Sequence, residues 1–327
     1  MFKQVKQLLA RSEVFPAAER TPIVSIIVIV YDMPSQAQNT ILSLYADYQQ
    51  GVQAGDYEVL IIENASPNLM DAGFIASLPG NVRYILRENP EQSPVQAINF
   101  AASQAAGDNI CLMIDGARML TPGVVKNLIL GHRLHDRAVV AIPGYHLGKE
   151  LQQVAVQNGY GIEAERELIA SINWPENGYS LFDIACFSGS SAPGFFLPNS
   201  ESNCISLPRD VWVDLGGYDP RFDLRGGGLT NLDFYKRACE FPGAQHIIVP
   251  GEGTFHQFHG GVTTGGEEEK VTEVYRDNSK EQYRKIRGQE YVCPETNPVF
   301  LGQFPEQAQR FLHYSSEMRT SNPDWIN

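Results

Sequence analysis

The stretch "ICLMIDGARM" (residues 110–119) is an apolar run that ends on one carboxylate, Asp115. Its apolar residues are continuous rather than alternating, which is typical of a strand buried on both faces of a parallel sheet. We therefore expect a strand over residues 109–115. Further apolar runs of similar composition predict strands over residues 23–31, 57–63, 82–86, 138–143 and 245–250.

Helical patterns separate these runs. In the clearest one, Ser93 can cap a helix and Gln96 completes a capping box. Apolar residues at helical spacing predict two more helices, over residues 38–48 and 121–132. Strands that alternate with helices of this length imply right-handed crossovers. The sequence thus predicts an α/β fold, with a mainly parallel central sheet flanked by helices.

Polar residues stand at the expected carboxyl ends of the strands, namely Tyr31, Asp32, Glu63, Asn64 and Asp115. In open α/β sheets, ligands bind in the crevice beyond these ends. The chain has neither the GxGxxG pattern of dinucleotide-binding folds nor the GxxxxGK[ST] pattern of P-loops. We therefore expect a site built from these side chains rather than from a phosphate-gripping glycine loop.

The charge balance limits the partners. The 25 basic and 38 acidic side chains among 327 residues give a formal charge of −13, which repels nucleic acid and anionic membranes. The N-terminal "MFKQVKQLLARSEVF" is amphipathic and basic but lacks the apolar core of a secretion signal. We expect a cytoplasmic protein that binds no nucleic acid and makes at most peripheral membrane contact.

Four segments resemble, in order and spacing, the nucleotide-sugar half of family 2 glycosyltransferases. They are "VSIIVIVYDMPSQAQNTILSL" (24–44), "YEVLIIENASPN" (57–68), "QAINFAASQAAGDNICLMIDGARMLTPGVV" (96–125) and "LPRDVWVDLGGYDPRF" (207–222). The resemblance implies the Rossmann-like GT-A fold. It divides the chain into an N-terminal helical extension (1–22), a GT-A domain (23–265) with a nucleotide-sugar half (23–145) and an acceptor half (146–265), and a C-terminal helical tail (266–327).

The resemblance also implies roles in donor binding. The end of the first strand, here Tyr31 and Asp32, lies beside the nucleotide base in the family, and Glu63 stands where an aspartate usually hydrogen-bonds uracil. Acids and serines also commonly cap strands and helices, which is the local explanation for several of these positions. The expected nucleotide-sugar-binding residues are Tyr31, Asp32, Glu63, Asn64, Ser93, Asn99, Asp115 and Arg118.

The family's DxD motif falls on "DGA" (115–117), so the later acid, which reaches a divalent metal in the family, is missing. Magnesium can bind through one or two carboxylates plus phosphate oxygens, so Asp115 can still support Mg²⁺ or Mn²⁺. His256 and His259 stand where the family often has a histidine near the metal, which completes the expected ligand set. Arg118 offers an alternative without metal, because a guanidinium can bind two phosphate oxygens.

The family's usual general base is also missing. When "GGGLTNLDFYKR" (226–237) is aligned on Asp233, Thr230 and Asn231 replace the family's Glu-Asp pair. Asparagine cannot act as the base, and general-base help is worth roughly 10²–10⁴-fold in rate. We expect Asp233, within one helical turn, to be the catalytic base. The other candidates are Asp219, Asp223 and Glu201.

Together these features predict a glycosyltransferase. It would move a sugar from a UDP-sugar to a hydroxyl of a glycan or glycolipid acceptor, with inversion, in polysaccharide or glycoconjugate synthesis, and residues 144–202 would hold the acceptor. The two missing acids leave an alternative open, a non-catalytic nucleotide-sugar- or glycan-binding protein on the same scaffold. A sugar nucleotidyltransferase would need a basic, glycine-rich loop after the first strand, which "VYDMPSQAQ" lacks.

Overall fold

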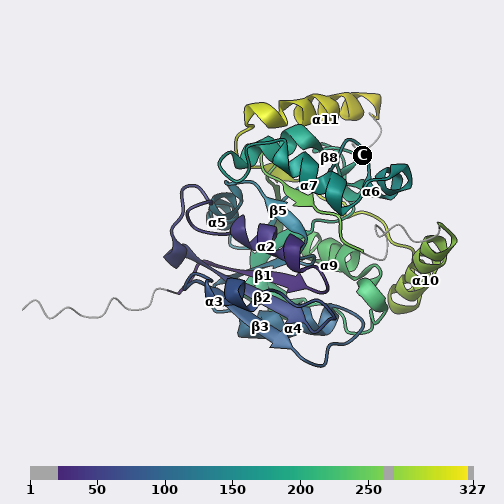
Figure 1. Cartoon of the computed structure of the whole chain (residues 1–327). Helices are drawn as coiled ribbons and strands as arrows, with labels where there is room; N and C mark the ends of the chain where they lie inside the picture. Colours follow the sequence, from purple (N-terminus) through teal and green to yellow (C-terminus); the bar gives the residue numbers. More distant parts are fainter. Residues whose placement is uncertain (1–20, 261–268, 323–327) are drawn as a thin grey trace, which may run out of the picture.

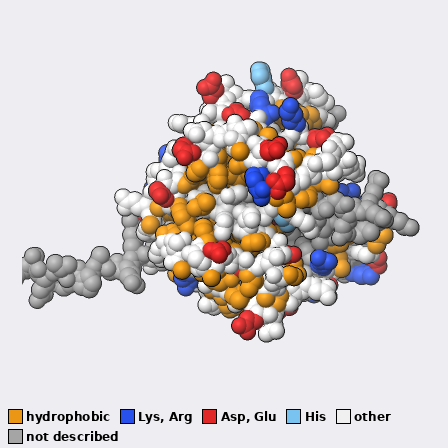
Figure 2. All heavy atoms as spheres, viewed as in Figure 1, with side chains coloured by type: hydrophobic (Ala, Val, Ile, Leu, Met, Phe, Trp, Pro, Cys, Tyr) orange, Lys and Arg blue, Asp and Glu red, His pale blue; other side chains and the backbone are white. Residues whose placement is uncertain are grey.

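The computed structural model describes residues 21–260 and 269–322. Apart from residues 21 and 22, the predicted N-terminal extension (1–22) lies outside the described residues, as does the start of the predicted tail (266–327). None of the described helices combines the length and the apolar character that a membrane span requires. Acidic side chains are spread over the face seen in Figure 2, with basic side chains among them.

A central eight-stranded sheet organises the molecule (Figure 1), in the order β12-β10-β6-β9-β4-β1-β2-β3. Neighbouring strands are parallel, except where β9 pairs antiparallel with β4 and β6. The predicted α/β fold with a mainly parallel sheet is confirmed. The strands are β1 (Val24–Val30), β2 (Tyr57–Asn64), β3 (Val82–Arg87), β4 (Asn109–Met113), β6 (Ala138–Ala141), β9 (Cys204–Pro208), β10 (Gln245–Ile248) and β12 (Val299–Phe300).

A second sheet of four short strands has the order β5-β11-β7-β8. Its strands have only three or four residues, too few for a periodic signal, and the sequence did not predict this sheet. β5 and β11 are antiparallel and bring Arg118 opposite His256. The strands are β5 (Arg118–Leu120), β7 (Gly144–Leu147), β8 (Ala185–Phe187) and β11 (Thr254–His256).

Helices cover both faces of the main sheet. α2 (Pro34–Leu42) and α5 (Val124–Leu134) contribute to the apolar core on one face. α4 (Val95–Gln104), α8 (Arg209–Asp214) and α9 (Thr230–Cys239) contribute to the core on the other. Alternate residues of β1 enter the two cores, and all seven are buried. The continuous apolar composition of this strand therefore reflects burial on both faces, as predicted.

The C-terminal helices pack on different parts of the molecule (Figure 1). α10 (Glu269–Arg287) joins the core that contains α9 through Tyr283. α11 (Gln309–Ser321) packs through Phe311 onto Tyr145 of the second sheet, with ring centroids 4.8 Å apart. The remaining helices are α3 (Ala72–Ala76), α6 (Gln152–Ala155) and α7 (Ile162–Ala170), and the 3₁₀ turns are η1 (Ala54–Asp56), η2 (Val156–Asn158), η3 (Gly178–Ile184), η4 (Gly189–Ser191), η5 (Arg225–Gly227) and η6 (Glu306–Ala308).

Two local predictions near the strand ends are wrong in detail. β4 ends at Met113, so Asp115 follows the strand by two residues instead of terminating it. α4 begins at Val95, and the predicted capping box does not form. Instead the Ser93 hydroxyl donates to the carbonyl of Phe222 at 2.6 Å. The same hydroxyl accepts from the Val95 amide at 3.4 Å, so Ser93 joins the start of α4 to the loop that contains Phe222.

Candidate active site

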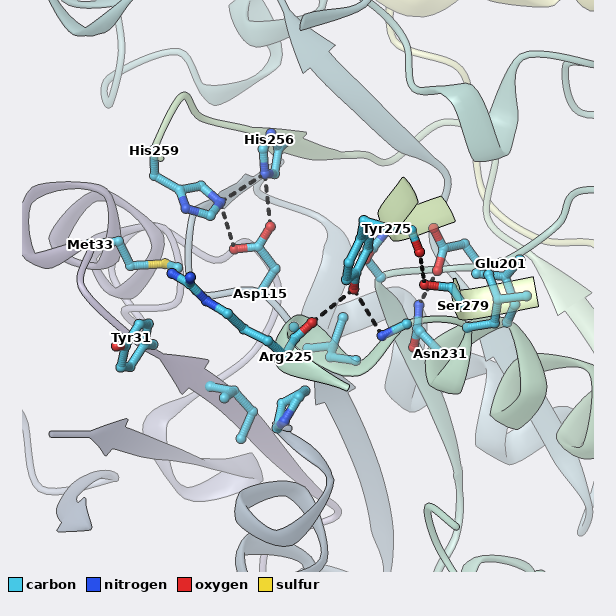
Figure 3. Close-up of a pocket in the computed structure, with 18 of the residues that line it drawn as sticks. Tyr31, Met33, Asp115, Glu201, Arg225, Asn231, His256, His259, Tyr275 and Ser279 are labelled. Carbon is cyan, nitrogen blue, oxygen red and sulfur yellow. Dashed lines mark hydrogen bonds and ion pairs between the residues drawn. The ribbon is translucent and has the colours of Figure 1, made fainter. Parts of the chain in front are cut away.

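A cavity of about 760 Å³ opens beyond the carboxyl ends of β1, β2 and β4 (Figure 3). This volume lies within the ~300–1,000 Å³ typical of small-ligand sites. The second sheet, the turn at residues 225–228 and α10 supply its other walls. Of the side chains expected from the sequence, those that line the cavity are Tyr31, Asp32, Asn64, Asp115, Arg118, His256 and His259.

Asp115, His256 and His259 form a compact cluster, with one ligand atom of each residue within 4.8 Å of the others. His256 Nε2 lies 2.8 Å from Asp115 Oδ2, and His259 Nε2 lies 3.5 Å from Asp115 Oδ1. Burial alone would raise the pKa of Asp115, but the two histidines hold it well below its usual value. The cluster therefore presents an ionised carboxylate together with imidazole nitrogens.

Gln152 fixes the orientation of His256. The Gln152 amide donates through Nε2 to the carbonyl of His256 at 3.0 Å, so its Oε1 faces His256 Nδ1 at 2.5 Å. This arrangement places the imidazole proton on Nδ1 and leaves the Nε2 lone pair facing Asp115. Burial lowers the pKa of His256 to about 4, so the ring is neutral at neutral pH. His256 Nε2 lies 2.8 Å from Asp115 Oδ2 and 3.1 Å from His259 Nε2, and this mixed imidazole and carboxylate set fits a divalent metal.

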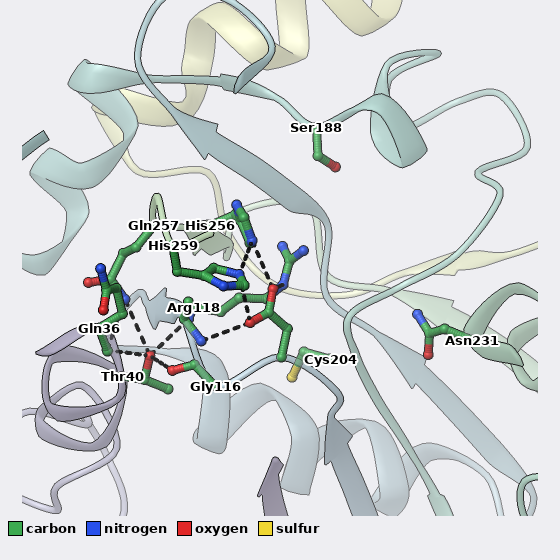
Figure 4. A network of polar contacts seen from close by, with 12 residues as sticks. Gln36, Thr40, Gly116, Arg118, Ser188, Cys204, Asn231, His256, Gln257 and His259 are labelled. Atoms are coloured by element: carbon green, nitrogen blue, oxygen red, sulfur yellow. Dashed lines mark hydrogen bonds and ion pairs between the residues drawn. The ribbon is translucent and has the colours of Figure 1, made fainter. Parts of the chain in front are cut away.

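Arg118 lies beside this cluster and is almost fully buried, with 6% of its surface exposed. Figure 4 shows it next to His256 and His259. Its Nε is 3.7 Å from Asp115 Oδ2, and neither Nε nor one terminal nitrogen has a hydrogen-bond partner among the described residues. Burial lowers the pKa of Arg118. A buried guanidinium with unused donors at a cavity wall is suited to an anionic ligand.

The opposite wall carries residues that the sequence did not single out. In Figure 3 the Arg225 side chain extends across the cavity toward Met33. Tyr275 of α10 holds the turn that carries Arg225, because its hydroxyl accepts from the Gly228 amide at 3.0 Å and donates to the Arg225 carbonyl at 2.9 Å. Three consecutive glycines with positive φ, at 226–228, form this turn. Lys280 of α10 also lines the cavity.

Glu63 and Ser93 do not line the cavity, contrary to prediction. Glu63 is fully buried, where its carboxylate accepts from the Met70 amide at 3.0 Å and from the Tyr84 hydroxyl at 2.5 Å. The alternation along β2 decides this outcome, because Glu63 shares the face of Ile61, which belongs to the core under α2. Ser93 is held by the bond to the Phe222 carbonyl.

Asn99 and Asp233 also lie outside the cavity lining. The Asn99 side chain donates to the carbonyl of Tyr218 and accepts from its amide. Asp233 is 1% exposed and forms ion pairs with Arg237 at 2.8 Å and Arg287 at 2.6 Å. This placement argues against the predicted role of Asp233 as the catalytic base, because its carboxylate connects α9 to α10 and lies outside the cavity lining.

Known proteins resemble this chain in sequence and in fold. Residues 25–181 match the model of the family described as Glycosyl transferase family 2. Similar solved structures include TarS from S. aureus (14% identity, 80% of this chain and 42% of that chain, TM-score 0.48), the mannosyltransferase PcManGT from Pyrobaculum calidifontis in complex with GDP-Man and Mn²⁺ (14%, 99% and 78%, 0.49), and S. aureus TarS 1–349 in complex with UDP-GlcNAc (12%, 91% and 72%, 0.49). The chain thus spans 42% of the first TarS chain. No curated protein matches the sequence.

Proposed function

We propose that this chain, whose residues 25–181 match the model of glycosyl transferase family 2, moves a sugar from a UDP-sugar to a hydroxyl group of a glycan or glycolipid acceptor. The observation that carries this proposal is the meeting of Arg118 with the cluster of Asp115, His256 and His259 in one cavity. A nucleotide-sugar has a diphosphate that needs a cation on one side and hydrogen-bond donors on the other. The cluster of Asp115, His256 and His259 can hold the cation, and Arg118 supplies the hydrogen-bond donors.

A divalent metal would be held by Asp115, His256 and His259, and when bound it would neutralise charge on the departing nucleoside diphosphate. Arg118 binds phosphate oxygens through the donors that have no partner within the described part of the chain. Arg225, whose side chain extends across the cavity toward Met33 in Figure 3, would add a second guanidinium for the nucleotide. These residues stabilise negative charge where it develops, which is the larger part of what such a reaction requires.

The nucleoside lies at the ends of β1 and β2 in this proposal. The Tyr31 ring is 45% exposed and free to stack on a base, while Asn64 presents an amide that can pair with the polar edge of uracil. Asp32, at a left-handed φ of 56°, accepts from the Asn68 amide at 2.8 Å, which fixes the loop beside this pocket. The ribose then lies between Asp32 and Asp115.

Isothermal titration with UDP, GDP and uridine, with and without MnCl₂, tests the proposal. We expect UDP to bind in the presence of Mn²⁺, more tightly than uridine, and Asp115→Asn to remove the Mn²⁺ dependence. Release of UDP from UDP-glucose or UDP-N-acetylglucosamine distinguishes an enzyme from the alternative, a non-catalytic binding protein. If the wild type binds no nucleoside diphosphate, or binds UDP equally well after Asp115→Asn, the proposed site is wrong.

A further inference from the structure

Asn231, at the position where the resemblance places a catalytic acid, is a fully bonded amide. It lies in the first turn of α9 and is 6% exposed. Its Oδ1 accepts from the Tyr218 hydroxyl at 2.7 Å, and its Nδ2 donates to Glu201 Oε2 at 2.6 Å and to the Ser202 carbonyl at 3.1 Å. These contacts require an amide at this position, because two of its three partners are acceptors. One of those acceptors is a carboxylate that lines the cavity.

Glu201 differs from Asp233 in the charge of its partners. Asp233 is fixed between two arginines and lies outside the cavity lining. Glu201 forms no ion pair within 4 Å with any described residue, and its hydrogen-bond partners are the neutral amides of Asn231 and Asn203. A carboxylate held by neutral donors has no paired cation that would favour its ionised form. Burial raises the pKa of Glu201 above its ordinary value.

The charged and titratable groups facing Glu201 come from several elements. Arg118 of β5 lowers its pKa, and Asp115, beyond the end of β4, raises it. The tyrosines Tyr218 and Tyr291 also interact electrostatically with it. Figure 3 shows Glu201 and Asn231 across the cavity from Asp115. A sugar held between these walls would have its leaving diphosphate on the Asp115 side and a free approach on the Glu201 side.

We infer that Glu201 is the general base toward the acceptor hydroxyl and that Asn231 positions it; this inference rests on the proposed function. The O–H bond of the acceptor breaks and its proton moves to a Glu201 oxygen. The acceptor oxygen forms a bond to the anomeric carbon, while the bond from that carbon to the diphosphate breaks and its electron pair leaves with UDP. Glu201 then loses the proton to solvent. Attack from the side opposite the leaving group inverts the anomeric carbon.

This exchange of roles accounts for the amide at position 231, where the resemblance places an acid. An aspartate at position 231 would place a second carboxylate 2.6 Å from Glu201 and would also face the Ser202 carbonyl. Like charges at that distance push one pKa strongly upward. The acid at 201 and the amide at 231 are therefore a matched pair, in which the proton acceptor comes from the loop before β9 instead of from α9.

The test uses the release of UDP from UDP-glucose or UDP-N-acetylglucosamine, whichever the wild type hydrolyses, since a general base also activates water. Glu201→Gln should lower kcat by roughly 10²–10⁴-fold, with the Kd for UDP unchanged. The wild-type kcat should fall as the pH drops through the pKa of Glu201, because the protonated acid cannot accept a proton. This acid limb should disappear in Glu201→Gln.

The matched control is Glu281→Gln, which removes an exposed carboxylate that pairs with Lys285 at 2.6 Å and does not line the cavity; its kcat should stay at the wild-type value. The single variant Asn231→Asp should have a lower kcat than the wild type. The double variant Glu201→Gln with Asn231→Asp should have a kcat at least tenfold above that of Glu201→Gln, because the reversed pair restores one carboxylate and one amide. If Glu201→Gln does not fold, Glu201→Asp, which keeps the charge, replaces it in the test. The kcat of Glu201→Asp should still fall at low pH, but at a different pH from the wild type.

An unchanged kcat in folded Glu201→Gln, a retained acid limb in that variant, or equal losses of kcat and UDP affinity would overturn the assignment. Failure of the wild type to bind UDP at all would instead overturn the proposed function. The two failures are distinguishable, because UDP binding depends on the Asp115 side of the cavity and the proton transfer depends on the Glu201 side.

Discussion

Replacing Arg118 with methionine should weaken diphosphate binding without destabilising the protein. The side chain is 6% exposed, two of its nitrogens have no hydrogen-bond partner among the described residues, and its nearest carboxylate oxygen is 3.7 Å away. A buried polar group left without a partner costs about 1–3 kcal/mol. Methionine keeps most of the apolar stem and removes that cost. We expect the Tm of Arg118→Met to equal or exceed the wild-type Tm.

The effect on binding should be large and specific to the phosphates. A hydrogen bond to a charged group contributes about 1.5–3 kcal/mol, so the loss of a two-pronged contact from Arg118 should raise the Kd for UDP by at least roughly 100-fold. Uridine has no diphosphate and should bind both proteins alike. Arg118→Lys is the matched control, because it keeps the charge but not the planar fork. Its Kd for UDP should lie between those of the wild type and Arg118→Met.

Isothermal titration with UDP and uridine, and thermal unfolding without ligand, measure the two effects separately. Equal weakening of UDP and uridine binding would mean that Arg118 acts through the shape of the pocket and not through the phosphates. An unchanged Kd for UDP, or a Tm that falls by several degrees, would refute the view that the guanidinium is kept at a cost to stability for the sake of an anionic ligand.

Three other changes test separate parts of the site. Gln152→Leu removes the acceptor for His256 Nδ1 and should raise the Kd for Mn²⁺ about 10–100-fold, measured by titration; an unchanged Kd would exclude this orienting role. Asp233→Asn breaks a buried ion pair and should cost about 3–5 kcal/mol in urea unfolding, with kcat per folded molecule unchanged; a kcat loss of two orders of magnitude would restore Asp233 as the base. Arg225→Gln should raise the Kd for UDP about tenfold, near 1.4 kcal/mol, and Tyr275→Phe should do so less strongly, whereas equal effects on uridine would contradict a diphosphate contact.

The sequence predicted six of the eight strands of the central sheet from their buried apolar composition, missing β9 and β12, and it predicted the Asp115, His256 and His259 group through the resemblance. Prediction failed where a side chain's direction depends on partners far away in the chain. Glu63, like Asp115, was expected at a strand end. The side chains of β2 alternate between the two faces of the sheet, and Glu63 lies on the face that packs into the core. Asp233 is bound by Arg287, 54 residues later, which no local pattern indicates.

Other parts of the site left no local trace in the sequence. β5 and β11 have three residues each, yet their pairing sets Arg118 opposite His256. Gln152 comes from a helix of four residues and reaches a histidine 104 positions away. Such contacts are set by tertiary packing, since neither periodicity nor capping rules extend beyond a single element.

The sequence presented a metal and Arg118 as alternative ways to neutralise a diphosphate, and the geometry makes them dependent on each other. Asp115 Oδ2 lies 2.8 Å from His256 Nε2 and 3.7 Å from Arg118 Nε, so both depend on one carboxylate. A metal held by Asp115 would neutralise the negative charge that the carboxylate presents to Arg118. The guanidinium would then attract a phosphate group more strongly. We therefore expect Mn²⁺ to tighten UDP binding, and by thermodynamic reciprocity UDP to tighten Mn²⁺ binding by the same factor. In Arg118→Met, the part of this coupling that passes through the guanidinium should be lost, and only direct attraction between metal and phosphate should remain.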